Sequence, residues 1–198
     1  MKKLAVLIST VGTGSNLQAI IDAIEADKLN AKIALVISDS KEALGLKRAK
    51  KHSLKIAICP KKEDLLLILE KLKPDYSVLA GWKQIVSDEV IDKFQNRILN
   101  LHPGLVPQTI KGSVRNPDGT PALWNRGLLA EKAIQNFLDQ KSTYAGSTVH
   151  FLSKEFDFGQ VLARGFVKIK KGDTVETLYE RLKAVEHKIY IESLQKLC

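Results

Sequence analysis

The sequence predicts an α/β fold of the Rossmann-like kind, with a doubly wound, mostly parallel twisted sheet and flanking helices. In the first half, short apolar runs alternate with segments whose apolar residues recur every three to four positions. The apolar runs are unbroken, which is typical of strands buried on both faces. Strand and helix alternate at the spacing of right-handed crossovers, which favours parallel strands.

Five strands and four helices are expected in residues 1–101. The strands are expected at residues 4–8, 33–37, 56–59, 76–80 and 97–101. The first helix is expected to begin with Ser15 as its N-cap, since Ser is a preferred capping residue. The other three helices are expected at residues 41–52, 63–73 and 88–94.

The pattern changes after Pro103. Residues 104–125 hold three prolines, three glycines and the turn sequence Asn116-Pro117-Asp118-Gly119, which predicts a long irregular loop. A helix at 128–138, strands at 147–152 and 160–169, and a closing helix at 174–197 with a partial Thr174/Thr177 cap follow. We therefore expect one domain, residues 1–198, made of halves 1–101 and 102–198.

The composition is that of a globular protein, with 44% hydrophobic and 27% charged residues. The apolar run at the start is too short for a signal peptide or a membrane span, and two cysteines, Cys59 and Cys198, make neither a disulfide framework nor a metal cluster. A cytoplasmic protein without a membrane partner is expected. The net charge of +9 fits a solvated surface or small anionic substrates, and nucleic acid least, because no aromatic residues are interleaved with the lysines.

The loop at residues 9–16 joins the first strand to the first helix. Gly12 and Gly14 let backbone N–H groups face outward at the positive end of the helix dipole, where phosphate binds well. No Gly-Lys-Ser/Thr sequence follows, so the loop is not a P-loop. A plain strand-to-helix connector is the alternative.

Asn100 and His102 end the fifth expected strand, just before Pro103. Residues two apart on a strand project from the same face. An amide donor beside a titratable donor suits an oxygen that gains negative charge. The alternative is a strand-end pair satisfied by neighbouring backbone.

His150 and Asp157 flank the exit of a later strand. Asp157 lies between Phe156 and Phe158, and apolar surroundings would raise the pKa of its carboxylate. A carboxylate of that kind could carry a proton or pair with a histidine. The alternative is a turn aspartate before Gly159.

In combination and in chain order, these motifs resemble the folate-dependent formyltransferases. The motifs that carry the resemblance are Gly14-Ser15-Asn16-Leu17, Leu79-Ala80-Gly81-Trp82, Asn100-Leu101-His102-Pro103, and Ser147-Thr148-Val149-His150-Phe151 with Asp157. The resemblance covers nearly the whole chain. It implies the fold described above and formyl transfer from 10-formyltetrahydrofolate to the amine of glycinamide ribonucleotide in purine biosynthesis, with no metal.

The resemblance also implies roles for particular residues. Asn100 and His102 would hold the oxyanion of a tetrahedral intermediate, and Asp157 would orient groups or carry a proton through water. The expected substrate-binding residues are Gly14, Ser15 and Asn16 for the phosphate, Glu186 for the ribose hydroxyls, Lys183 as its assistant, and Pro103. The expected folate-binding residues are Trp82, Lys83, Gln84, Ile85, Val86 and Phe156, and Ser147 and His150 would support the catalytic set. From the helix pattern alone, Glu186 would be a surface charge.

Three departures from the family pattern stand out. Residues 10–13 lengthen the first loop. Gln84 stands where a basic residue is expected near the folate tail, which leaves Lys61, Lys62 or Lys83 as partners. The segment 108–126, with Arg115, Trp124 and Arg126, is longer than the corresponding loop in many relatives and would be a lid, a substrate clamp or an interface.

Other functions stay open at this point. A hydrolase of the same folate would need no phosphate loop, and formylation of transfer RNA would need a further domain. Formyl transfer to a sugar nucleotide is less favoured by Gly14-Ser15-Asn16, and a folate- or nucleotide-binding regulator would not need Asn100, His102 and Asp157. Both a monomer and a homodimer are compatible with the sequence.

Overall fold

The computed structural model describes residues 1–10 and 12–198. Val11, in the lengthened first loop, lies outside these residues. The chain forms two compact units, one of residues 1–100 with 194–198 and one of residues 101–193. The boundary after Asn100 lies one residue before the expected division between the halves.

The first unit contains a parallel sheet. Its strands are β1 (Lys2–Ile8), β2 (Ala31–Ser38), β3 (Ile56–Ile58), β4 (Tyr76–Leu79) and the first three residues of β5 (Ile98–His102). They are hydrogen-bonded in the order β3-β2-β1-β4-β5, and every pair is parallel. β1 is central and Leu4, Ala5 and Val6 are fully buried, as its unbroken apolar run predicts.

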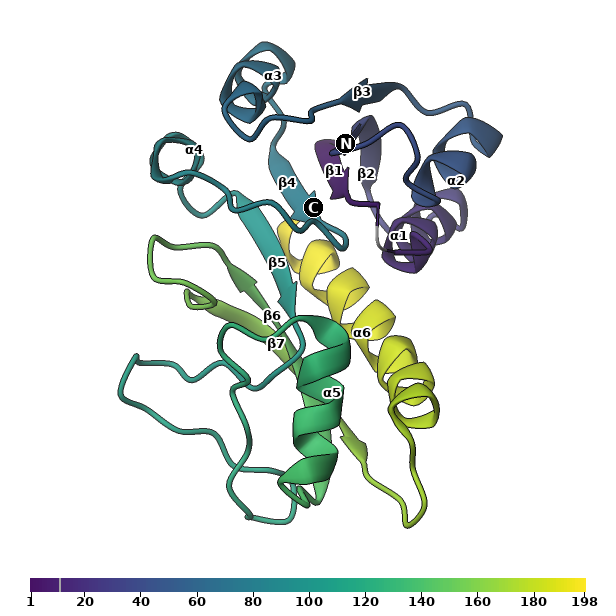
Figure 1. The fold of residues 1–198 in the computed structure, drawn as a ribbon. Helices are drawn as coiled ribbons and strands as arrows, with labels where there is room; N and C mark the ends of the chain where they lie inside the picture. The colour runs from purple at the N-terminus through teal and green to yellow at the C-terminus, as the bar shows by residue number, and fades with distance from the viewer. Residues whose placement is uncertain (11) are drawn as a thin grey trace. The chain divides into compact units, whose positions relative to one another are not determined.

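The helices of this unit are α1 (Ser15–Glu25), α2 (Gly45–Lys51), α3 (Asp64–Leu72) and α4 (Asp88–Lys93), and α1 and α2 lie side by side (Figure 1). The expected helix at 41–52 begins four residues late. Ser38 Oγ donates to Ser40 O at 2.8 Å, and the Glu42 N–H donates to Ser40 Oγ at 3.2 Å. These local bonds replace the hydrogen bonds of a first helical turn.

The expectation that Ser15 caps the first helix was wrong. The N-cap is Gly14, which has a left-handed backbone with φ of 72° and makes no side-chain cap bond. A Cβ atom at this position would lie 2.7 Å from the Cα atom of Gly45 at the start of α2. Both the backbone conformation and the close approach of α2 therefore require glycine.

The second unit contains β6 (Tyr144–Phe151), β7 (Val161–Lys168), α5 (Ala130–Asp139) and most of α6 (Val175–Leu197). β6 and β7 are antiparallel, and α5 runs along them (Figure 1). The core cluster of this unit is Leu105, Ile134, Phe137, Ala145, Leu178 and Leu182. Thr174 and Thr177 exchange backbone-to-side-chain hydrogen bonds at 2.9 and 3.3 Å, so the partial cap signal corresponds to a reciprocal cap.

Residues 104–125 form the predicted long irregular loop. Its two limbs are tied by hydrogen bonds from Leu105 N to Leu123 O and from Ala122 N to Val114 O, both 2.9 Å. A bridge between Arg115 and Pro121 closes the turn at its tip. Within residues 1–10 and 12–198, no helix is both long and apolar enough to cross a membrane.

Candidate active site

The end of β5 carries the two polar residues that the sequence singled out. Asn100 and His102 are two residues apart on this strand, and the spacing directs both side chains to one face. His102 is 2% exposed, while Asn100 is half-buried. β5 therefore carries an amide and an imidazole at its carboxyl end.

His102 faces two oxygens within the second unit. Its Nε2 atom lies 2.7 Å from the backbone oxygen of Trp124, and its Nδ1 atom lies 3.6 Å from Oδ1 of Asp157. A carbonyl oxygen can only accept, so Nε2 carries a proton and donates it. The structure thus brings together His102 and Asp157, which are far apart in the sequence.

Asp157 is held as a charged group. Burial raises the pKa of its carboxylate, but His102, which faces it, and the hydrogen bond from the backbone N–H of Gly127 lower it by more. The Gly127 N–H donates to Oδ2 at 2.8 Å. The net pKa lies below the ordinary value, so the expectation of a raised pKa was wrong. Partners that stabilise the anion outweigh the apolar surroundings.

His150 is fully buried on β6, and its ring centroid lies 6.5 Å from that of His102. Burial lowers its pKa to about 4, and the nearby charge of His102 adds to this effect. Nδ1 donates to the backbone oxygen of Phe151 at 2.9 Å. His150 is therefore neutral at pH 7, with its tautomer set by that bond, and adds no positive charge beside His102.

Glu186 lies on α6 and is 4% exposed, so the surface position suggested by its helix pattern was wrong. Burial raises the pKa of its carboxylate, against the opposing effects of Ser147 and Lys183. Ser147 Oγ donates to Oε1 at 2.7 Å. Lys183 instead pairs with Glu180 at 2.6 Å, and its Nζ atom lies 4.6 Å from the ring centroid of Tyr179. A carboxylate buried at this cost is typical of a binding site.

The glycine loop at the start of α1 has a partner that the sequence analysis missed. Arg48, on α2, donates from Nε to Thr13 O at 2.8 Å and from Nη1 to Gln18 Oε1 at 3.1 Å. Asn16 Oδ1 is buried with no hydrogen-bond partner. Arg48 lies in a run of basic residues, and nothing in that run distinguishes it from the lysines around it.

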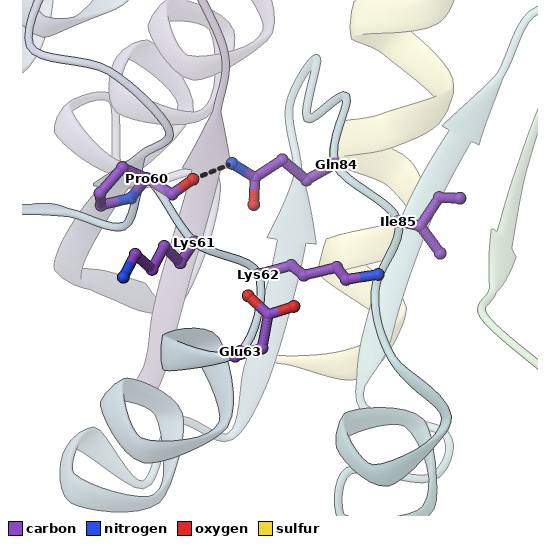
Figure 2. Close-up of a pocket in the computed structure, with 6 residues that line it drawn as sticks. All are labelled: Pro60, Lys61, Lys62, Glu63, Gln84 and Ile85. Carbon is purple, nitrogen blue, oxygen red and sulfur yellow. Dashed lines mark hydrogen bonds between the residues drawn. The ribbon is translucent and has the colours of Figure 1, made fainter.

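A pocket of about 420 Å³ lies within the first unit, lined by Pro60, Lys61, Lys62, Glu63, Gln84 and Ile85 (Figure 2). Gln84 Nε2 donates to Pro60 O at 3.1 Å, as the dashed line in Figure 2 shows. Ile85 is 65% exposed. Two of the expected folate-binding residues therefore line this pocket.

The other expected folate-binding residues have varied surroundings. Val86 is 7% exposed, whereas Phe156 in the second unit is 54% exposed. Lys83 N donates to Ser9 Oγ at 2.9 Å. The indole nitrogen of Trp82 is buried with no hydrogen-bond partner, which leaves a donor for a ligand.

Among residues 1–10 and 12–198, no group of three or more His, Cys, Asp or Glu side chains is placed to hold a metal ion.

Several known proteins are similar to this chain in sequence. The phosphoribosylglycinamide formyltransferase of Haemophilus influenzae is 34% identical over 96% of this chain and 84% of its own length. The chloroplastic enzyme of that name from Arabidopsis thaliana is 30% identical and the trifunctional purine biosynthetic protein of Bos taurus 37% identical. This chain spans 65% of the former and 18% of the latter.

A crystal structure of glycinamide ribonucleotide transformylase 1 from Symbiobacterium toebii matches the fold with a TM-score of 0.83. The identity is 33%, over 98% of this chain and 86% of that chain. This match confirms the predicted fold class. The sequence pattern of the formyl transferase family, described as "Formyl transferase", matches residues 2–194. The chain therefore belongs to the formyl transferase family.

Proposed function

We propose that this chain transfers the formyl group of 10-formyltetrahydrofolate to the amine of glycinamide ribonucleotide, a step of purine biosynthesis. The observation that carries the proposal is the His102–Asp157 pair, with Asn100 two residues earlier on the same strand. The names and coverage of the relatives support the same reaction. The cytoplasmic location and the choice between monomer and homodimer stay predictions.

In the proposed chemistry, the substrate amine attacks the formyl carbon and the carbonyl oxygen gains negative charge. The amide of Asn100 donates a hydrogen bond to that oxygen, and the imidazole of His102, held opposite Asp157, stabilises it as well. The attacking amine loses a proton, and the nitrogen of the leaving tetrahydrofolate gains one. Asp157 orients His102 or relays that proton through water. One well-placed donor to such an oxygen contributes about 3 kcal/mol to transition-state stability.

The phosphate of the substrate is proposed to bind the first turn of α1. The backbone N–H groups of a first turn lack partners within the helix, and the helix dipole favours an anion there. Gly14, Ser15 and Asn16 supply these groups, and the Arg48 bond to Thr13 O holds the loop in place. The buried Oδ1 of Asn16 can only accept, so it would pair with a hydroxyl or amide donor of the substrate and not with the phosphate.

The ribose hydroxyls are proposed to donate to Glu186. The carboxylate is buried, and the hydroxyl of Ser147 is a partner that leaves its remaining lone pairs free to accept. Lys183 contributes a favourable charge. Hydroxyl donors from a ligand would pair a carboxylate whose burial is otherwise unfavourable.

Glu186→Gln is expected to raise the KM for glycinamide ribonucleotide by about 10- to 100-fold, because hydrogen bonds to a charged group contribute about 1.5–3 kcal/mol. Glu176→Gln, an exposed residue at the start of the same helix, is the matched control and should leave this KM within about twofold. Steady-state kinetics with the second substrate saturating would measure both. Equal KM values in the two variants would contradict the role of Glu186.

The same substitution should stabilise the fold. The folded pKa of Glu186 is raised, so the carboxyl contributes stability below its unfolded pKa, and that contribution is lost as the pH rises through the folded pKa. Glutamine does not titrate. Glu186→Gln should therefore melt above the wild type at pH 8, by a margin that shrinks towards pH 4.

The folate co-substrate is proposed to bind near the pocket of Figure 2, with the carboxylates of its tail at Lys61 and Lys62. The fit is supported by two exposed ammonium groups, the apolar side chain of Ile85 and the unpartnered indole N–H of Trp82. Gln84 already bonds Pro60 O, so it is a poor partner for a carboxylate.

Replacing Lys61 and Lys62 together with methionine is expected to raise the KM for a polyglutamylated folate more than that for the monoglutamate, because the longer tail carries more negative charge. The difference should shrink at high salt. Lys132→Met, an exposed residue on α5, is the control. An equal change for both folates would place the tail elsewhere.

The acceptor can be tested directly with a ¹³C-formyl donor. The protein would be incubated with glycinamide ribonucleotide, with an amino-sugar nucleotide, or with neither. The proposal predicts a ¹³C-formamide product with the first acceptor. Label appearing chiefly on the amino-sugar nucleotide, or as formate without an acceptor, would replace it with the corresponding alternative.

A further inference from the structure

The segment of residues 124–127, at the end of the long loop, makes contacts to both members of the His102–Asp157 pair. We propose that this segment, here called the clasp, positions the two groups for the proposed formyl transfer, with Trp124 and Arg126 as its positioning residues. The inference rests on the proposed function. It assigns a role to part of the loop that the sequence left open among lid, clamp and interface.

The first contact fixes the proton on the His102 ring. The backbone oxygen of Trp124 accepts from Nε2 at 2.7 Å, so that nitrogen holds its proton. Gly104 makes the approach possible, since a Cβ atom there would lie 1.8 Å from the same oxygen. Nδ1, which faces Asp157, is therefore the ring nitrogen left to exchange a proton.

The second set of contacts fixes Asp157. Its backbone is left-handed, with φ of 49°, a conformation that disfavours side chains other than glycine, asparagine and aspartate. Trp124 Nε1 donates to Asp157 O at 3.0 Å, Arg126 Nε donates to Phe156 O at 2.8 Å, and Gly127 N donates to Oδ2. Three hydrogen bonds from one short segment therefore hold the left-handed backbone of Asp157 in place, as is common for unusual backbone conformations at functional sites.

The clasp is itself anchored in the second unit. Asn125 is 7% exposed and donates to Pro103 O at 3.1 Å and to Ala133 O at 3.2 Å. The guanidinium of Arg126 lies 5.1 Å from the Trp124 ring centroid and pairs with Glu155 at 3.2 Å. The segment therefore acts as a fixed support.

The test uses Trp124→Phe, which keeps the ring and removes the indole donor, and Arg126→Met, which keeps the stem and removes the guanidinium. Each should lower kcat by about 10- to 100-fold, since small misplacement of catalytic groups has effects of this size, while the KM values change less than threefold. Arg126→Lys should recover part of the loss. Arg115→Met is the matched control, because Arg115 lies in the same loop and bonds Gly119 O at 2.8 Å.

A pH profile separates positioning from a general loss of structure. The contacts around Asp157 lower its pKa, so loosening them should raise that pKa, and the acid limb of kcat should move to higher pH in both clasp variants. The inference would be overturned if both clasp variants had the kcat of the wild type and an acid limb at the same pH. The inference would also be overturned if kcat fell in the clasp variants while the acid limb stayed in place, and if Arg115→Met showed the same fall.

A measurement on the unmodified protein removes dependence on variants that fail to fold. The ¹⁵N shifts of the His102 ring should show a protonated Nε2, and an unprotonated Nε2 would overturn the inference. Failure of the clasp is distinct from failure of the proposed function. If only the clasp inference fails, the wild type formylates glycinamide ribonucleotide and the clasp variants do so at the same rate. If the proposed function fails, the wild type itself shows no such turnover.

Discussion

Asn100→Ala is expected to lower kcat by about 10²–10³-fold. The amide is the uncharged donor proposed to face the formyl oxygen, and one such donor contributes about 3 kcal/mol in the transition state. The interaction strengthens as charge develops, so kcat should fall more than the KM values rise. Steady-state rates with both substrates saturating would measure it.

The matched control for this substitution is Asn30→Ala, an exposed residue of the same unit just before β2. It should leave kcat within about twofold of the wild type. If Asn100→Ala keeps a kcat within about fivefold, the proposed oxygen-binding role of Asn100 is refuted.

Asp157→Asn is expected to lower kcat by about 10²-fold or more, the lower end of what positioned proton transfer contributes. Asparagine accepts a left-handed backbone and can still receive the Gly127 N–H, so the shape should survive while the charge opposite His102 is lost. Far-UV circular dichroism and Tm would check the fold. A kcat near that of the wild type would remove Asp157 from the chemistry.

The pH dependence follows from the direction of the Asp157 shift. Its folded pKa is lowered, so the charged form contributes stability that is present above the unfolded pKa, about 3.9, and is lost as the pH falls through the folded pKa. The wild type should keep the activity that depends on this carboxylate to a lower pH than a carboxylate of ordinary pKa would allow. Asp157→Asn should lose the part of the acid limb that belongs to Asp157.

Much of the first unit follows from its sequence because a strand buried on both faces must be apolar throughout. β1 and β4 lie where their apolar runs predict. The second unit shows where such patterns fail. β6 begins at Tyr144, before the predicted start at residue 147, and it contains Gly146, a residue type that is unfavourable inside a strand. In the fold, a Cβ atom there would lie 2.7 Å from Gly165 O, so the strand needs glycine to pair closely with β7.

The candidate site was predictable where side chains carry the information. Strand periodicity alone places Asn100 and His102 on one face, and the resemblance to known formyltransferases adds Glu186 and the catalytic role of Asp157. The direction of the Asp157 pKa was wrong because its stabilising partners come from distant parts of the chain. The contact between His102 and Trp124 spans 22 residues and uses a backbone oxygen. A backbone oxygen is present at every residue, so no sequence pattern marks it.

The most direct test of the central claim is a steady-state assay of tetrahydrofolate release from 10-formyltetrahydrofolate, with and without glycinamide ribonucleotide, for the wild type and His102→Ala. The account predicts release that depends on the amine in the wild type and collapses in the variant. Release at the same rate without the amine would show a hydrolase. Amine-dependent release that survives in His102→Ala would contradict the proposed chemistry at the end of β5.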